Sequence, residues 1–141
     1  MQFQPYLMFD GNCAQAMRFY EGVIGGKLEP MLKFSEMPEQ CADLPAGTSV
    51  GDRIAHACLV HDGALLMASD TLPGQPYEGM KNFGVALTFP TPEAARKVFD
   101  ALAGGGQVTM PLGRTFWAEA FGMVTDRFVT PWMVNGGMKA D

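Results

Sequence analysis

One order of local patterns occurs twice in this chain, and that internal repeat constrains the fold more than any single motif. In the first half, a short apolar run at 5–11 precedes a helical pattern at 12–26, and strand patterns follow. In the second half, a strand pattern at 82–90 precedes a helical pattern at 91–106, and strand patterns again follow. A repeat of this length is typical of a duplicated supersecondary unit. We therefore expect a strand, a helix and three strands, used twice, with a break near residue 75.

Local signals mark the ends of several elements. Asn12 is a candidate N-cap for the first helix, whereas Thr91 is the candidate cap of the second and Pro92 takes its first helical position. The pair Asp62-Gly63 separates two strand patterns and predicts a tight hairpin turn. Each half is therefore expected to form one βαβββ module, the first at about 1–72 and the second at about 80–137.

The remaining strands are less regular. The segment 27–37 alternates like a half-buried strand, and 38–52, rich in Pro, Gly and Asp, is expected to be a loop. The segments 115–126 and 127–136 predict a closing hairpin. Two curled sheets with their helices outside belong to the α+β class and enclose a concave groove, which is a common place for a ligand site.

Charge and cysteine usage exclude several functions. The formal net charge of −5 comes without a run of Lys or Arg, so we expect neither nucleic acid nor a membrane surface as a partner. No signal peptide and no membrane-spanning run is predicted. The three cysteines form no CxxC pair, which is typical of reduced thiols in a cytoplasmic protein and predicts neither a disulfide framework nor a zinc site.

The closing segment carries a resemblance to a known family. It reads Phe-Trp-Ala … Phe-Gly-x-Val-Thr-Asp-x-Phe … Pro-Trp-Met over residues 116–133. With 5–29, 34–38 and 54–70, it resembles the PhnB-like branch of the vicinal oxygen chelate superfamily, which includes glyoxalase I, bleomycin-resistance proteins and extradiol dioxygenases. The resemblance implies a single PhnB-like domain over 1–141 with the glyoxalase/bleomycin resistance fold: two βαβββ modules that form a curled mixed sheet around a concave groove. It also implies a homodimer.

Family members have been labelled 3-demethylubiquinone 3-methyltransferase-like. The sequence does not support methyl transfer, because it has no Gly-rich strand–loop–helix of the kind that binds S-adenosylmethionine.

The superfamily's usual divalent metal is held by His, Glu or Gln from the first and last strands of each half. Aligned on this chain, those positions fall near Pro5, at Met67, at Phe83 or Gly84, and at Met133. Thioether sulfur suits soft ions and not Mg, Mn, Ni or Zn. We therefore predict no metal site and no cofactor, and the usual divalent metal is disfavoured.

His56 is a candidate site residue of the first module. Strand alternation groups it with Ile54 and Cys58 on one face. Two interpretations stay open: a core histidine with satisfied hydrogen bonds, or a pocket group that performs acid–base chemistry or binds a ligand.

The closing hairpin supplies the other candidates. Alternation places Trp117, Glu119 and Phe121 on one face, where they are predicted to contact a ligand. Glu119 is either a general base beside the indole or a solvated carboxylate. If His56 and Glu119 face one groove, they are joint candidates for a catalytic or ligand-binding role.

Other residues of the same hairpin are expected to be structural. We expect Trp132 to lie in the core, Asp126 to form a turn and Phe116 to be scaffolding. Asp10 and Asp70, which follow strand patterns in the first half, also read as turn-formers.

Three functions remain in competition. The sequence favours a protein that binds a small organic molecule in an aromatic, Met-rich groove without the usual metal, as the bleomycin-resistance proteins do. The second is a metal-dependent lyase, isomerase or dioxygenase. The third is a non-enzymatic homodimer with a structural or regulatory role.

Overall fold

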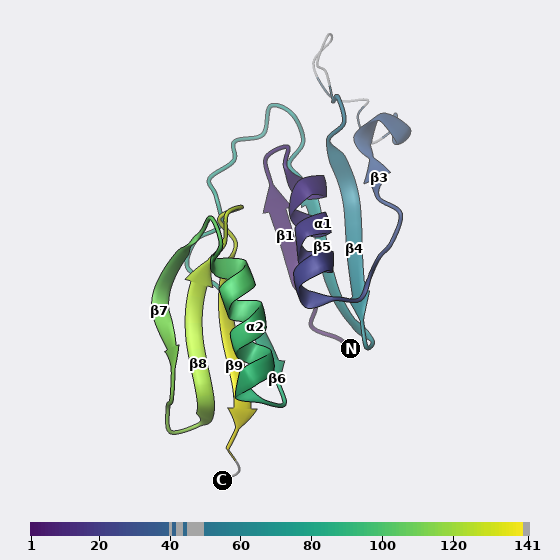
Figure 1. Cartoon of the computed structure of the whole chain (residues 1–141). Helices are drawn as coiled ribbons and strands as arrows, with labels where there is room; N and C mark the ends of the chain where they lie inside the picture. The colour runs from purple at the N-terminus through teal and green to yellow at the C-terminus, as the bar shows by residue number, and fades with distance from the viewer. Residues whose placement is uncertain (40, 42–43, 45–49, 140–141) are drawn as a thin grey trace. The chain divides into compact units, whose positions relative to one another are not determined.

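The computed structural model describes every residue except 40, 42–43, 45–49 and 140–141. It divides into two compact units, Met1–Gly79 and Met80–Asp141. Each unit contains one mixed sheet and one long helix (Figure 1). Among the described residues, no helix is both long and apolar enough to cross a bilayer.

The first unit is built on a five-stranded sheet with the order β1-β5-β4-β2, and β3 also pairs with β4. Strand β1 runs parallel to β5, whereas β4 is antiparallel to β5, β2 and β3. The elements are β1 (Tyr6–Phe9), α1 (Cys13–Ile24), β2 (Lys27–Leu28), β3 (Leu32–Lys33), the 3₁₀ turn η1 (Phe34–Glu36), β4 (Ile54–His61) and β5 (Ala64–Asp70).

The second unit repeats this topology with a four-stranded sheet in the order β6-β9-β8-β7. Strand β6 runs parallel to β9, and the other pairs are antiparallel. Its elements are β6 (Val85–Phe89), α2 (Pro92–Ala103), β7 (Gln107–Gly113), β8 (Ala118–Thr125) and β9 (Pro131–Met138). Strands β1, β5 and β4 correspond to β6, β9 and β8. The predicted α+β fold class, with two modules of one helix and one mixed sheet, is confirmed.

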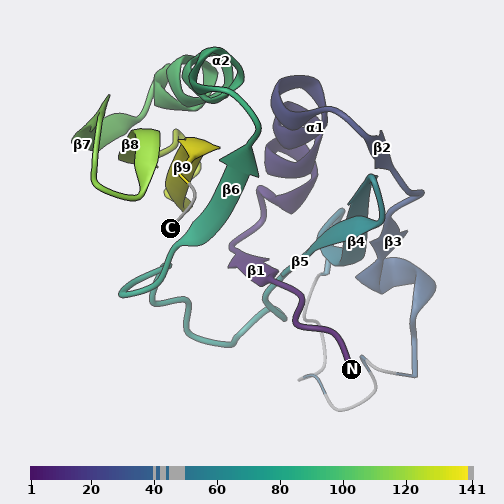
Figure 2. The same cartoon turned by 90° about the horizontal axis from the view of Figure 1, so that it is seen from below.

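Helix α2 covers one face of the second sheet (Figure 2). Its buried stripe consists of Ala95, Val98, Phe99 and Leu102. Two sheet glycines allow the close approach: a Cβ added at Gly122 would lie 2.7 Å from the Phe99 ring, and one at Gly136 would lie 2.5 Å from the Ala95 side chain. As predicted, Thr91 caps this helix, since its hydroxyl accepts a hydrogen bond from the Ala94 N–H at 3.2 Å.

The start of α1 differs from the prediction, because the Asn12 side chain makes no capping hydrogen bond. The buried carboxylate of Asp70, 1% exposed, acts in its place. Its Oδ1 accepts from the N–H groups of Gly11 (2.7 Å) and Cys13 (3.0 Å), and its Oδ2 accepts from Ile54 N–H (2.8 Å). Asp70 is therefore a junction between β5, α1 and β4, and its interpretation as a local turn-former was wrong.

The predicted strand over 27–37 is also broken. It consists of the two-residue strands β2 and β3 followed by η1. Pro30 lies between the two strands and has no N–H to donate to a sheet, which explains why the pairing is interrupted. The predicted loop at 38–52 falls partly on residues outside the described ones.

Both predicted hairpins are present. Asp62 (φ 49°) and Gly63 (φ 81°) form the first turn in the left-handed region that a two-residue hairpin needs. The strands of the last hairpin are shorter at their starts than predicted. Thr115 forms a turn before β8, in which its hydroxyl accepts from Ala118 N–H at 3.1 Å. Asp126 holds the turn before β9, since its Oδ1 accepts from the backbone N–H groups of Phe128 and Thr130.

Candidate functional site

The face of the β8–β9 hairpin opposite α2 carries a continuous row of side chains. Residues directly opposite each other in an antiparallel pair point to the same face. Three such pairs form the row: Phe121 with Asn135, Met123 with Met133, and Thr125 with Pro131. Three alternate pairs are buried: Ala120 with Gly136, Gly122 with Val134, and Val124 with Trp132.

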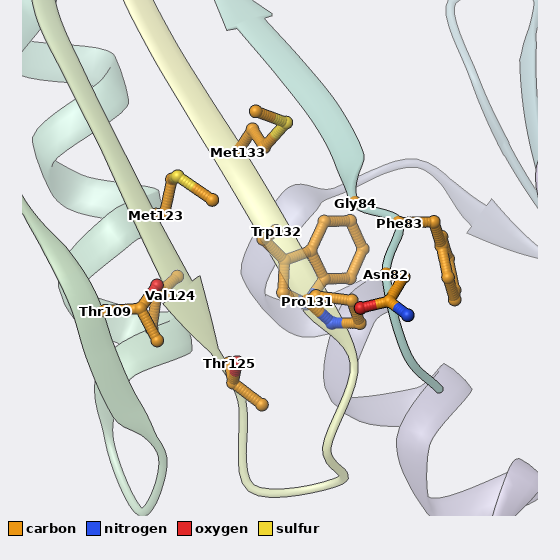
Figure 3. Close-up of a pocket in the computed structure, with 10 residues that line it drawn as sticks. All are labelled: Asn82, Phe83, Gly84, Thr109, Met123, Val124, Thr125, Pro131, Trp132 and Met133. Carbon is orange, nitrogen blue, oxygen red and sulfur yellow. The ribbon is translucent and has the colours of Figure 1, made fainter. Parts of the chain in front are cut away.

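A pocket of about 350 Å³ opens on this row (Figure 3). It is lined by side chains or backbone of ten residues: Asn82, Phe83, Gly84, Thr109, Met123, Val124, Thr125, Pro131, Trp132 and Met133. None of the ten is ionisable. The two methionine side chains project from β8 and β9, and the segment that leads into β6 supplies a further wall.

That wall depends on two unusual backbone positions. Asn82 has a φ of 61°, in the left-handed region that asparagine tolerates better than most residues. At Gly84, an added Cβ would lie 3.1 Å from Cγ and 3.3 Å from Sδ of Met133. Gly84 therefore lets the β6 segment lie close against the Met133 side chain.

The structure places the predicted residues Trp117, Glu119 and Phe121 on this same face, but beyond the lining of the pocket. The Trp117 indole N–H donates to Asn135 Oδ1 at 3.2 Å, and its ring meets Phe121 edge-on, with centroids 5.1 Å apart. Glu119 is exposed and lies over Gly137, where an added Cβ would approach its Oε2 to 2.8 Å. Their role in ligand binding stays a prediction.

Trp132 and Asp126 have the structural roles that the sequence predicted, one in the core and one at a turn. Trp132 is 1% exposed, and its indole N–H donates to the buried Asp126 carboxylate at 2.8 Å. The third expectation was wrong: Phe116 is 88% exposed and contacts the Trp117 ring edge-on, because it lies in the turn before β8 and not within the sheet.

His56 lies in the first unit, half-buried on β4. Its Nδ1 is 3.3 Å from the Tyr6 hydroxyl, and the two rings are 5.9 Å apart. The strand registers place Cys58 and Tyr6 on either side of Met67, so these side chains share one face. Ile54 does not join this group and is buried. The β3–β4 register shifts between Leu32, the partner of His56, and Lys33, the partner of Ile54, which breaks the alternation between the two residues. His56 is thus in contact with a second polar group, and its joint use with Glu119 stays a prediction.

The thiols near these elements are poor nucleophiles. Burial, and secondarily the charge of Asp70, raises the pKa of Cys13 to about 12. Burial, and secondarily the charge of Glu29, also raises the pKa of Cys58. A thiol with a raised pKa stays protonated at neutral pH, so neither cysteine is suited to covalent catalysis.

Comparison with known proteins identifies the family. The family model for the glyoxalase/bleomycin resistance protein/dioxygenase superfamily matches residues 2–134. The chain belongs to this superfamily. It is also 38% identical to protein YjdN of Escherichia coli (strain K12) over 142 aligned positions, covering 96% of this chain and 95% of that protein.

Solved structures agree with this assignment. Protein PA1353 from Pseudomonas aeruginosa is 47% identical, covers 96% of both chains and superposes with a TM-score of 0.84. A Bacillus cereus PhnB protein, described as a putative 3-demethylubiquinone-9 3-methyltransferase, is 22% identical, with a TM-score of 0.74 and coverage of 96% and 98%. The superfamily predicted from the closing hairpin is confirmed.

The superfamily implies a metal, and the strand registers give the neighbours of the two methionines that the sequence aligned with its ligand positions. Met67 pairs with Tyr6, and Met133 pairs with Ala86. Tyr6 lies one residue from Pro5, and Ala86 lies two residues from Gly84 and three from Phe83, which are the positions that the sequence suggested. Neither a thioether beside a phenol, in the first unit, nor a thioether beside a methyl group, in the second, fits a hard divalent ion. In the described part of the chain, no three His, Cys, Asp or Glu residues are grouped to hold a metal.

Six pocket residues were missed by the sequence: Asn82, Thr109, Met123, Val124, Thr125 and Pro131. Met123 carried a usable signal, since it continues the alternation of Glu119 and Phe121 along β8. Phe83, Gly84 and Met133 were noticed only as metal positions that lacked a ligand. Nothing local indicated Asn82 or Thr109.

Proposed function

We propose that this protein binds a small organic molecule on the aromatic, Met-rich face of its second unit, without a divalent metal. The observation that supports this most is the pocket of about 350 Å³ whose ten lining residues include no ionisable side chain. Its volume falls near the lower end of the roughly 300–1,000 Å³ of ordinary ligand pockets, so a small ligand fits best.

The lining favours a ligand with a ring system. Met123 and Met133 offer polarizable thioethers, and sulfur contacts an aromatic ring favourably. Phe83, 47% exposed, adds an aromatic surface at the same pocket. Contacts of this kind depend on burying apolar area, and need no charge on either partner.

The proposal extends along the same face to the residues that the sequence singled out. Phe121 lies two positions from Met123 on β8, and Trp117 packs on Phe121. We propose that Trp117, Phe121 and Glu119 contact the part of a ligand that reaches beyond the pocket. His56 is proposed as a second ligand-contacting group in the first unit, held by Tyr6.

The test is a calorimetric titration of metal-free protein, dialysed against EDTA, with the neutral aromatic probe 2-naphthamide. One saturable site is expected, and its affinity should not change when Ni²⁺, Mn²⁺, Zn²⁺ or Fe²⁺ is added. Binding that appears only with one of these ions would favour the alternative of a metal-dependent enzyme. A complete lack of saturable binding by neutral aromatic probes would overturn the proposal.

We also propose a homodimer. The sheet of the second unit ends at β7, which exposes Val108 (40%) and Met110 (44%). An edge strand with apolar side chains is a natural surface for pairing with another chain. Sedimentation of the parent and of a Val108→Lys/Met110→Lys variant tests this: the parent is expected to sediment as a dimer and the variant as a monomer. A monomeric parent would refute it.

A further inference from the structure

We propose that the ligand of the second-unit pocket is uncharged and carries an amide-like group that forms hydrogen bonds with Asn82. This inference rests on the proposed function, because it names the chemical class that the same pocket selects. Three observations carry it: the composition of the lining, the state of the Asn82 amide and the packing around Gly84.

The lining selects against charge. A carboxylate or ammonium that leaves water must be compensated by a partner, and the ten lining residues offer no charged side chain. The indole N–H of Trp132 is already donated to Asp126 and is not available to a ligand. A charged ligand would therefore lose hydration without gaining an ion pair.

Asn82 is the versatile polar group of the lining. Its side chain makes no hydrogen bond within the described part of the chain, and the residue is exposed at the pocket. A carboxamide offers two N–H donors and one carbonyl acceptor, so it pairs best with a group that both donates and accepts, such as a carboxamide, lactam or imide. The hydroxyls of Thr109 and Thr125 each offer one donor and their acceptor lone pairs on a single oxygen atom.

The backbone holds Asn82 in place beside the apolar wall. Its φ of 61° is uncommon for a residue with a side chain, and such conformations are concentrated at functional sites. Two residues later, Gly84 lies against the Met133 side chain, which fixes the path of this segment on β9. The amide is therefore presented at one side of a methionine-lined surface, as Figure 3 shows for Asn82, Gly84 and Met133. A flat ring on the methionines with a polar group toward Asn82 matches this arrangement.

The experiment compares three bicyclic probes that differ in one substituent: 2-naphthamide, 2-methylnaphthalene and 2-naphthoate. We expect 2-naphthamide to bind at least tenfold more tightly than 2-naphthoate and several-fold more tightly than 2-methylnaphthalene. Asn82→Gly keeps the left-handed backbone accessible while it removes the amide. This variant is expected to lose the preference for 2-naphthamide over 2-methylnaphthalene, with the affinity for 2-methylnaphthalene unchanged. Gln107→Ala is the control for loss of an exposed polar side chain outside the pocket, and it should keep the preference.

The outcomes separate the inference from the proposed function. If 2-naphthoate binds as tightly as 2-naphthamide, or if Asn82→Gly changes all three affinities equally, the inference fails and the small-molecule function stands. If none of the three probes binds to the parent protein, the proposed function fails as well. Circular dichroism of each variant verifies that its fold is retained before its affinities are compared.

Discussion

Met123 and Met133 lie directly opposite each other on β8 and β9, and both line the same pocket. In the alignment that the sequence suggests, Met133 falls at the position where the superfamily usually has a carboxylate ligand. In the proposed function, the pair offers a ligand two flexible, polarizable thioethers, which do not suit a hard metal ion. This difference is the physical basis of the proposed binding function without a divalent metal.

Truncation of this pair tests the pocket. Met133→Ala removes apolar contact area worth about 1–2 kcal/mol, so the affinity for 2-naphthamide is expected to fall about 5- to 30-fold. Isothermal titration calorimetry measures the change. Met138→Ala is the matched control, since Met138 lies on the same strand, is 51% exposed and does not line the pocket. Equal losses in both variants would argue against the Met-lined site.

Trp117 is predicted to serve binding and stability through different atoms. Trp117→Ala removes the ring beside Phe121. Its effect on the free energy of probe binding is expected to exceed its effect on the free energy of unfolding. Trp117→Phe keeps a ring but leaves the buried Asn135 without the indole donor, so it should cost about 1–3 kcal/mol of stability with little loss of binding. If Trp117→Ala binds the probe as the parent does, Trp117 has no place on the binding face.

The Asp70 junction is predicted to be essential for the first unit. Asp70→Ala leaves three backbone N–H groups without their acceptor and is expected to lower the free energy of unfolding by about 3 kcal/mol or more. Asp10→Ala is the comparison, because it removes a largely exposed carboxylate paired with Arg53 at 2.9 Å and should cost less than about 1 kcal/mol. Urea denaturation measures both. Similar losses would show that the junction contributes nothing beyond a surface ion pair.

Cys13 predicts a dependence of stability on alkaline pH. Its folded-state pKa is raised from 9.0 to about 12, so the folded protein holds the thiol proton more tightly than the unfolded chain does. The resulting stability is fully present below pH 9.0 and is lost as the pH rises from there toward about 12. Cys13→Ala should flatten part of the decline in unfolding free energy that the parent shows from pH 9.0 toward about 12. An unchanged slope in Cys13→Ala would contradict the assignment.

Some features of this protein follow from residues that are near each other in the chain. The turn at Asp62-Gly63 and the Thr91 cap of α2 depend on contacts within a few residues, and both were predicted correctly. The repeat of helices and strands, and the closing hairpin that identifies the superfamily, are also patterns along the chain. Alternation along β8 correctly grouped Glu119 and Phe121 on one face, because side-chain direction in a strand has a period of two.

Other features depend on residues that only folding brings together. The first helix is capped by Asp70, which lies 57 residues from Cys13 and reaches it because β5 pairs with β1. The pocket forms because parallel pairing places the segment before β6 beside β9, which brings Asn82 and Gly84 to Met133. No local pattern encodes such a contact, since the distance between these residues is set by the order of strands in the sheet. Side-chain periodicity thus determined which residues share a face of the hairpin. The sheet topology determined where on that face the pocket lies.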